Sequence, residues 1–180
     1  MNLICCSFVL SFMRKIILNL AITLDGFIAG PNGEYDWCFT DADYGMADFL
    51  NSIDTTLIGG KSYRLLQQYG PPYPEFTNYV FTRTEKDNPY LNVKLVSEDI
   101  PTFARRLKKE KGKNIWLFGG AEIAQSLLEA DLVDELMLSV HPILLGNGLP
   151  LFRKTNDRKE FTLLQSIPYP TGLVQLIYKK

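Results

Sequence analysis

The spacing of apolar and polar positions along the chain predicts an alternation of strands and helices. Short runs of consecutive apolar, largely β-branched residues indicate strands that are buried on both faces. Apolar residues three and four positions apart indicate helices with one buried face, as for Ile100, Phe103, Ala104 and Leu107. The expected strands are residues 14–21, 55–58, 79–81, 93–96, 115–118, 136–143, 161–166 and 173–178. The expected helices are residues 43–52, 61–68, 100–109 and 121–129.

This alternation determines the expected fold class. Strands that alternate with helices predict a mostly parallel sheet with helices on both of its faces. The last two strands flank the short segment PYPTG at residues 168–172, which is too short for a parallel crossover. We therefore predict an α/β protein with a three-layer α/β/α architecture, a mostly parallel mixed central sheet and an antiparallel C-terminal edge. No repeat or linker interrupts the pattern, so residues 13–180 are expected to form one domain.

The first twelve residues differ in character from the rest of the chain. The segment MNLICCSFVLSF is apolar and uncharged, and it carries Cys5 and Cys6. Arg14 and Lys15 follow this run, whereas a signal peptide places its positive charges before it. The run is also shorter than the about 20 apolar residues that a bilayer span needs. Because MRKIILNLAITLDG looks like a natural start at Met13, we expect residues 1–12 to be an extension outside the fold.

Composition and charge limit the classes of partner. The 180 residues are 46% hydrophobic, and 19 basic against 20 acidic residues give a net charge of −1. Such a chain has the apolar content of a globular domain and lacks the basic excess of proteins that bind nucleic acid or acidic membranes. Three cysteines without C-x-x-C spacing and the single histidine His141 predict no metal site and suit a reducing compartment. We expect a cytoplasmic protein with a small-molecule substrate, a structural His141, and a solvated basic helix face at residues 105–111.

Two junctions join a strand, a glycine pair and a helix. They read GGKS at residues 59–62 and GGAE at residues 119–122. Glycine allows a ligand to approach the backbone closely, and a helix start offers unpaired N–H groups to phosphate. Lys61 adds a cation and Ser62 a hydroxyl, and both junctions are expected at the edge where parallel strands end. Neither matches a standard nucleotide fingerprint, so these residues predict a phosphate-bearing cofactor of open identity, with two tight turns as the alternative.

The order of four segments resembles that of a known family. TLDGFIAG, IGGKSY, LFGGAEIAQSLLEADLVDEL and HPILLGNGLPLF together are similar to the dihydrofolate-reductase-like family, in the branch of the riboflavin-biosynthesis reductase domain and its stand-alone relatives. The resemblance covers residues 13–180. It implies the dihydrofolate-reductase-like fold, a homodimer, and NADPH-dependent hydride transfer to a small heterocyclic, carbonyl or imine substrate. The reference activity is that of 5-amino-6-(5-phosphoribosylamino)uracil reductase of riboflavin biosynthesis.

The resemblance also implies which residues hold the cofactor. The second glycine junction is expected under the pyrophosphate and nicotinamide, Thr82 and Arg83 beside the ribose 2′-phosphate, and Ala21 and Ile28 over the nicotinamide. Family members commonly carry a basic residue where this chain has Gly60, which leaves NADH as the alternative cofactor. The full implied set is Ala21, Ile28, Gly59, Lys61, Ser62, Thr82, Arg83, Phe118, Gly119, Gly120, Ala121, Glu122 and Ile123.

Four residues are candidates for the substrate side. The resemblance places Leu145 and Gly146 at the substrate mouth or at a subunit contact. Asp25 belongs to the loop that closes over the nicotinamide, and it is also a residue type that caps tight turns. Trp37 either stacks against the substrate or anchors the periphery of the core.

Asp43 is the candidate proton donor or substrate anchor, with Asp41 and Asp48 as competitors for the position. The alternative for Asp43 is a helix N-cap, where Asp is favoured. A second class of function remains open, a non-catalytic nucleotide-binding or regulatory module on the same fold, because a basic residue at position 60 and a pterin-site acid motif are both missing. The chain has no H-x-E…P-C-x-x-C signature, so it lacks the zinc deaminase half of the bifunctional riboflavin protein.

Overall fold

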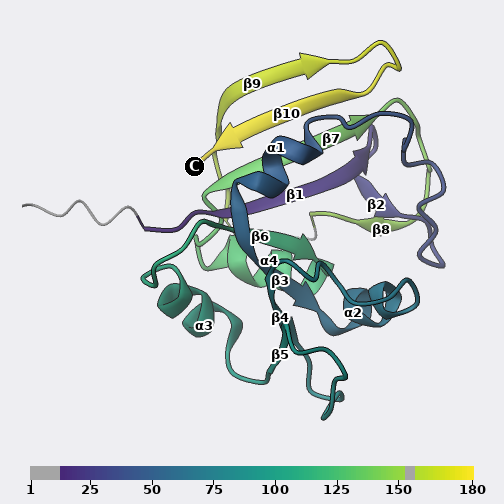
Figure 1. The fold of residues 1–180 in the computed structure, drawn as a ribbon. Coiled ribbons are helices and arrows are strands. Elements are labelled where there is room, and N and C mark those ends of the chain that lie inside the picture. The colour runs from purple at the N-terminus through teal and green to yellow at the C-terminus, as the bar shows by residue number, and fades with distance from the viewer. Residues whose placement is uncertain (1–12, 153–156) are drawn as a thin grey trace, which may run out of the picture.

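An eight-stranded mixed sheet forms the centre of the computed structural model, which describes residues 13–152 and 157–180 (Figure 1). The strand order is β5-β4-β3-β6-β1-β7-β10-β9. Neighbouring strands are parallel from β5 to β7, and β10 pairs antiparallel with β7 and β9. The strands are β1 (Ile16–Thr23), β3 (Ile53–Gly59), β4 (Thr77–Phe81), β5 (Val93–Val96), β6 (Asn114–Gly119), β7 (Glu135–His141), β9 (Thr162–Pro168) and β10 (Val174–Lys179). This arrangement confirms the predicted mixed sheet with its antiparallel C-terminal edge.

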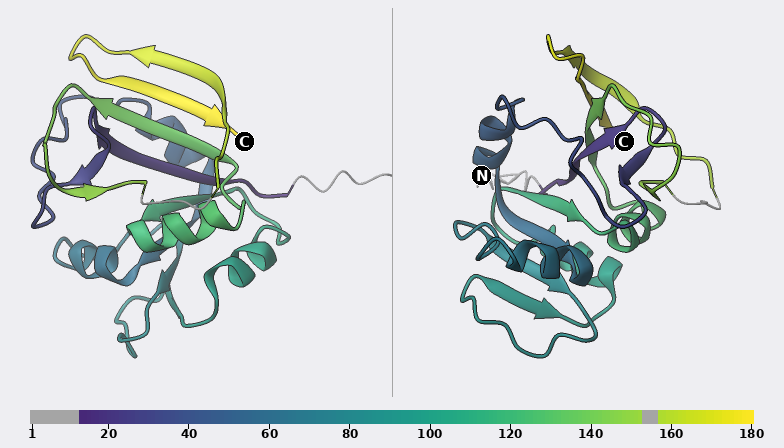
Figure 2. Two further views of the ribbon diagram at one scale, coloured as in Figure 1. Left: turned by 180° about the vertical axis from the view of Figure 1, so that it is seen from behind. Right: turned by 90° about the vertical axis from the view of Figure 1, so that its right-hand side faces the viewer.

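Helices cover both faces of the parallel part of the sheet. The helices are α1 (Met46–Asn51), α2 (Gly60–Gln67), α3 (Ile100–Leu107) and α4 (Ala121–Glu129). Buried residues of α3 and α4 share one apolar cluster with one face of the sheet, and Phe49 of α1 and Tyr63 of α2 pack on the other face. Figure 2 shows α1 and α4 on opposite sides of the sheet. The three-layer prediction is therefore confirmed.

Strand β1 shows why its sequence is apolar at almost every position. Ile16 and Leu18 point into the cluster with α3 and α4, whereas Ile17 packs with Phe49 and Trp116 on the opposite face. A parallel strand between two helical layers is buried on both sides, so an alternating pattern is not expected. Trp116 is buried, as a core residue, and its indole N–H donates to a β1 backbone carbonyl.

Several boundaries differ from those expected. Helix α1 begins at Met46 rather than at residue 43, because Tyr44 and Gly45 have positive φ angles of 51° and 78°. Strand β7 ends at His141, directly before Pro142. A separate two-stranded sheet of β2 (Phe27–Ala29) and β8 (Leu149–Pro150) was not expected. The proposed N-terminal extension, residues 1–12, lies outside the described residues.

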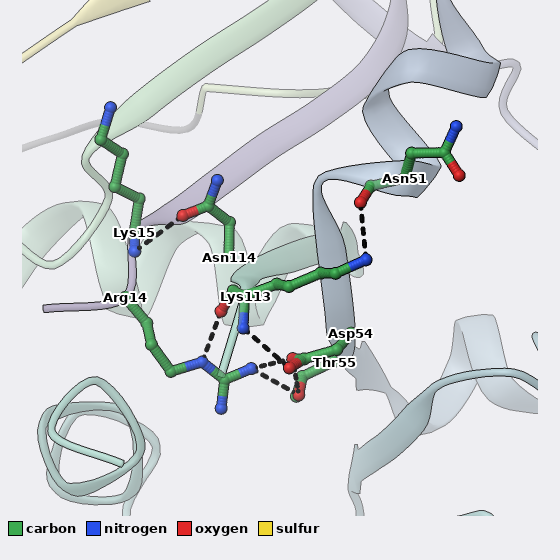
Figure 3. Close-up of polar contacts among 7 residues, drawn as sticks. All are labelled: Arg14, Lys15, Asn51, Asp54, Thr55, Lys113 and Asn114. Carbon is green, nitrogen blue, oxygen red and sulfur yellow. Dashed lines mark hydrogen bonds and ion pairs between the residues drawn. The ribbon is translucent and has the colours of Figure 1, made fainter. Parts of the chain in front are cut away.

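The amino ends of the parallel strands are joined by a buried arginine. The side chain of Arg14 is only 4% exposed and forms an ion pair with Asp54 (Figure 3). It also donates to Thr55 Oγ1 at 2.6 Å and to the carbonyl of Lys113 at 2.6 Å. These contacts connect the segment before β1 to β3 and to the loop before β6, at the end of the sheet away from the glycine junctions. The cluster therefore has a structural role.

One part of the predicted basic helix face is not solvated. Lys108 is 7% exposed, and its Nζ lies 2.6 Å from Asp134 Oδ2. Arg106 follows the expectation, because its guanidinium is exposed and pairs with Glu98. The prediction was wrong for Lys108, whose partner lies 26 positions later in the sequence. No helix among the described residues has the length and apolar character that crossing a membrane requires.

Candidate active site

A groove of about 730 Å³ runs along the carboxyl ends of β3, β4 and β5 and past the start of α4. Its volume is within the range of ligand pockets, roughly 300–1,000 Å³. Most of the predicted cofactor residues meet in its walls. These are Gly59, Lys61, Ser62, Thr82, Arg83, Gly120, Ala121, Glu122 and Ile123.

The two glycine junctions lie against each other in the middle of the groove. A Cβ atom at Gly59 would lie 3.4 Å from both the Gly119 carbonyl oxygen and the Gly120 Cα. Gly119 and Gly120 also have positive φ angles of 137° and 91°, which residues with a side chain rarely adopt. Both features keep backbone atoms at the surface of the groove, as a phosphate cradle requires.

Helix starts give the centre of the groove an electropositive character. The first-turn N–H groups of α2 and α4 donate no hydrogen bond to a capping side chain. Such groups, together with the helix dipoles, favour an anion at this position. Ser62 lies in the first turn of α2 and adds a hydroxyl. Lys61 Nζ lies 3.7 Å from Glu122 Oε1, which connects the first turns of the two helices.

One end of the groove lies beyond β4 and β5. The Thr82 hydroxyl accepts hydrogen bonds from the backbone N–H groups of Thr84 and Glu85 at 3.2 and 3.1 Å, which shapes the turn that carries Arg83. Arg83 is exposed and has no ion pair with any described residue. A Cβ atom at Gly60 would lie 3.3 Å from Thr82, so a side chain at position 60 would crowd this turn.

Sequence reasoning missed the segment after β5, which lines the same end of the groove as residues 97–100. Its two carboxylates are already engaged: Glu98 pairs with Arg106 at 2.7 Å, and Asp99 accepts from the Thr102 N–H at 3.0 Å. The sequence could have indicated this segment. It is polar and connects an apolar strand to a helix start, and ligands bind beyond the carboxyl ends of parallel strands, as was argued for the glycine junctions.

Four of the predicted cofactor residues lie outside the groove lining. Phe118 packs between Trp116 and Tyr73, at centroid distances of 5.0 and 5.6 Å. Gly119 is the buried last residue of β6, Ala21 lies on β1, and Ile28 packs from β2 against the main core. Leu149 of β8 lines the end of the groove that is nearest to this small sheet. The roles assigned to these four residues stay predictions.

Asp25 contacts two of the other substrate candidates, Leu145 and Gly146. Its carboxylate accepts from the Thr23 hydroxyl at 2.6 Å, from the Gly146 N–H at 2.7 Å and from the Leu145 N–H at 3.3 Å. The bond from Thr23 and the two backbone bonds lower the pKa of Asp25 below its usual value. A carboxylate held in its charged form is a poor proton donor, so these contacts favour the turn-capping interpretation of Asp25.

Trp37 lies in the loop between β2 and α1, away from the groove lining. Its ring packs edge-on against His141, with centroids 5.2 Å apart and an interplanar angle of 79°. Its indole nitrogen is buried and has no hydrogen-bond partner among the described residues. His141 has a partner for each ring nitrogen, which confirms its structural role.

The candidate acids cluster at the start of α1. Asp43 Oδ1 accepts from the Ala47 N–H at 3.0 Å, and its carbonyl accepts from the Met46 N–H at 2.9 Å. Asp43 therefore binds a first-turn N–H of α1 from two residues before the N-cap, which is Gly45 rather than Asp43. Asp41 accepts from the Tyr44 hydroxyl, and Asp48 lies in the first turn of α1. None of the three lines the groove, and the donor role of Asp43 stays a prediction.

Comparison with known proteins shows which protein family this chain resembles. A model of the RibD C-terminal domain matches residues 14–175. The uncharacterised protein YyaP of Bacillus subtilis is 42% identical over 180 residues, covering 92% of this chain and 94% of YyaP. The riboflavin biosynthesis protein RibD of Escherichia coli is 30% identical over 114 residues, which cover 55% of this chain and 29% of RibD.

Solved structures share the fold at lower sequence identity. A protein assigned to riboflavin biosynthesis from Shewanella sp. PV-4 superposes with a TM-score of 0.82 and 24% identity, over 92% of this chain and 98% of that one. A diaminohydroxyphosphoribosylaminopyrimidine deaminase/5-amino-6-(5-phosphoribosylamino)uracil reductase from Thermotoga maritima has a TM-score of 0.71 and 16% identity. The match covers 93% of this chain and 56% of the Thermotoga protein.

Proposed function

The chain belongs to the RibD C-terminal domain family, and from this premise we propose that it is an NADPH-dependent reductase. The observation that carries the proposal is the groove itself. It joins two glycine cradles, two helix starts without side-chain caps, and the exposed cation of Arg83. This is the order in which a dinucleotide presents its pyrophosphate and its adenosine phosphate.

The residues present fit such a cofactor. Gly59 and Gly120 line the groove with backbone, and a Cβ atom on either would approach the other junction to 3.4 Å. Ser62 would donate its hydroxyl to a phosphate oxygen. Ile123 and Leu149 line the end of the groove next to β8, where they would exclude water from the nicotinamide. Bound there, a reduced nicotinamide supplies the hydride, and the protein contributes orientation and a dry environment.

Arg83 supports NADPH over NADH. The 2′-phosphate that distinguishes NADPH carries negative charge, and Arg83 has no carboxylate partner among the described residues that would compete for it. The nearby carboxylates of Glu98 and Asp99 are held by Arg106 and Thr102. An arginine forms charge-assisted, forked hydrogen bonds to phosphate oxygens, so it is suited to this role.

The substrate class that we propose is a small heterocycle or a carbonyl or imine compound. The Thermotoga protein with this fold carries a uracil reductase activity in its name, which supports a related substrate. A proton must follow the hydride, from a carboxylic acid or an ordered water. Asp43 is the proposed donor, and it would have to exchange its contact with the Ala47 N–H for one with the substrate.

Two measurements test the proposal. Titration of NADPH and NADH, followed by protein fluorescence or thermal shift, should show binding of both with preference for NADPH. Arg83→Gln should reduce this preference without weakening NADH binding, and Arg105→Gln on the exposed face of α3 is the matched control. Absence of binding of either nucleotide would contradict the proposal. Binding without oxidation of NADPH by any of a panel of pterins, pyrimidines and carbonyl compounds would favour the non-catalytic nucleotide-binding module.

A further inference from the structure

The single histidine of the chain is held between two backbone groups. Nδ1 of His141 lies 3.0 Å from the Ser139 carbonyl oxygen, and Nε2 lies 3.1 Å from the backbone nitrogen of Phe39. A carbonyl oxygen only accepts and a backbone N–H only donates, so Nδ1 carries the proton and Nε2 is the acceptor. The ring is therefore neutral, and at 3% exposure it has no access to solvent that would replace either partner.

This contact joins a long loop to the sheet. The loop between β2 and α1 carries Trp37 and Phe39, and both rings pack against His141 with centroids 5.2 and 5.0 Å away. Within the described part of the chain, the Phe39–His141 bond is the hydrogen bond that connects residues 36–40 to the central sheet. The loop is attached again further on, where Gln175 Nε2 donates to the Tyr44 carbonyl at 3.2 Å.

The fastened loop lies beside the proposed reaction centre. His141 is the last residue of β7 and is in register with Thr23 at the end of β1. The Asp25 turn and the Leu145–Gly146 backbone lie directly beyond these two strand ends. Ligands of parallel sheets bind at this edge, so the loop covers the edge on the β1 and β7 side while the groove follows β3, β4 and β5.

We propose that His141 is a positioning residue whose neutral ring fastens the Trp37 loop across the carboxyl end of β7, and that protonation of this ring releases the loop. A proton on Nε2 would turn the acceptor of the Phe39 N–H into a second donor. The hydrogen bond would be lost, and a charged ring would remain in an aromatic pocket without a counter-ion in contact. The fastening itself is independent of the proposed reductase activity, and only its kinetic consequence rests on that function.

Burial sets the direction of the pH dependence. Removal of the ring from water lowers the pKa of His141 below its usual value, and the bond to Ser139 offsets part of this effect. A released loop exposes the ring and returns its pKa toward about 6.5. As the pH falls below that value, the released state binds a proton before the fastened state does. The free-energy advantage of the fastened over the released loop is therefore fully present above about pH 6.5 and decreases as the pH falls below that value.

Other titratable groups lie on the elements around the ring. The carboxylates of Asp36 and Asp41 belong to the loop itself, and Asp25 lies on the turn after β1. Hydrogen bonds keep Asp25 ionised by lowering its pKa, and burial, with the nearby Asp36 charge, raises the pKa of Cys38 to about 11, so both keep one form across the range. Tyr44 packs beside Phe39, and the hydrogen bond from its hydroxyl to Asp41 raises the pKa of Tyr44 above its usual value.

Two substitutions separate the hydrogen bond from the titration. His141→Gln places an amide oxygen where Nε2 accepts, so it should keep the Phe39 contact at every pH. His141→Asn places its amide where Nδ1 donates, so it should keep the Ser139 contact and lose the fastening. Both variants retain Asp36 and Asp41. A pH effect that came from these carboxylates would therefore persist in both variants.

The experiment is a pH titration of the whole protein. NMR of the histidine ring reports its pKa directly, because the chain has one histidine. Amide hydrogen exchange of Phe39, corrected for the intrinsic rate, reports the fastening. At neutral pH we expect protection in wild type and His141→Gln that is about tenfold that of His141→Asn, the factor that one hydrogen bond supplies. Below about pH 6 protection should fall in wild type alone.

Two results would overturn the proposal. One is a histidine that titrates at or above its usual pKa, and the other is a Phe39 amide whose protection is the same in all three proteins. The wild-type titration gives this answer even if a variant does not fold. Where a substrate is turned over, His141→Asn should raise its KM with NADPH affinity unchanged. Failure of NADPH binding would refute the proposed reductase and leave the exchange result intact.

Discussion

Lys61 and Glu122 stand on opposite sides of the cradle, with Nζ 3.7 Å from Oε1. Each belongs to the first turn of a helix whose N–H groups face the groove, Lys61 to α2 and Glu122 to α4. Both side chains are largely exposed, at 84% and 72%. The carboxylate thus pairs with the cation that would bind a cofactor phosphate, and its negative charge would oppose this binding.

Removing this carboxylate should strengthen nucleotide binding. We expect Glu122→Gln to lower the Kd for NADPH about threefold and Lys61→Gln to raise it by a similar factor, the size typical of exposed charge pairs. Both effects should shrink at high salt, because exposed charges are screened. The measurement is a fluorescence titration at low and high ionic strength. The pair Lys86→Gln and Glu75→Gln, outside the groove lining, is the control, and equal Kd values for all variants would contradict the prediction.

A methyl group at Gly120 should disrupt the cradle. The φ angle of 91° already disfavours any side chain, and a Cβ atom there would lie 3.4 Å from the Gly59 Cα. Gly33 has a φ angle of 92°, and a Cβ atom there would have no neighbour within 4 Å. Gly33→Ala therefore introduces the backbone strain without a steric contact. Both substitutions should destabilise the fold by about 1 kcal/mol, measured by urea unfolding. Only Gly120→Ala should also weaken NADPH binding, and equal binding by the two variants would count against a cofactor at this cradle.

Removing the charge of Asp54, the partner of the buried Arg14 in Figure 3, should lower the free energy of unfolding. Asp54→Asn leaves the guanidinium of Arg14, which is 4% exposed, without its counter-ion. Loss of one partner from a buried ion pair costs about 3–5 kcal/mol, and the partial exposure of Asp54 should reduce this to about 2 kcal/mol. Asp131→Asn is the matched control, since its lysine partners are more exposed and its loss should be smaller. Urea unfolding at neutral pH compares the two, and an equal loss would refute the assignment.

The sequence was sufficient for the features that local patterning encodes. The apolar runs of β1 and β6 and the amphipathic spacing of α3 predicted buried strands and helices, and the short C-terminal turn predicted the antiparallel edge. The strands β2 and β8 were missed because two or three residues show no periodicity. The start of α1 was misplaced because Asp43 has the sequence of a first helical turn, while Tyr44 and Gly45 adopt positive φ angles.

For the candidate site, local motifs were likewise predictable and long-range contacts were not. Glycine pairs, Lys61 and Ser62 were identified because a phosphate cradle is made from consecutive residues. The segment 97–100 enters the groove only because β5 ends beside β4, which depends on strand order. Lys108 and Asp134, and His141 and Phe39, are far apart in sequence, so no spacing rule indicates that they meet.

The outer edge of the sheet is where a second copy of the chain is expected. Strand β9 is an edge strand, and its sequence TLLQSIP contains no charged side chain. Leu163 and Leu164 on this strand are each 50% exposed. Edge strands of monomeric proteins are usually protected by charges, and exposed apolar groups on them favour association. Figure 1 shows β9 as the outermost strand at this end of the sheet.

We therefore predict that the chain forms a homodimer and that β9 is its interface. Replacing both Leu163 and Leu164 by Asp should convert the dimer into a monomer at micromolar concentration, measured by sedimentation equilibrium. The control is Leu91→Asp, because Leu91 is fully exposed just before β5, at the opposite edge of the sheet. Two-fold symmetric association uses the same patch on both subunits, so one pair of substitutions changes the interface twice. A wild-type protein of monomeric mass would contradict the homodimer, and a double variant that stays dimeric would place the interface elsewhere.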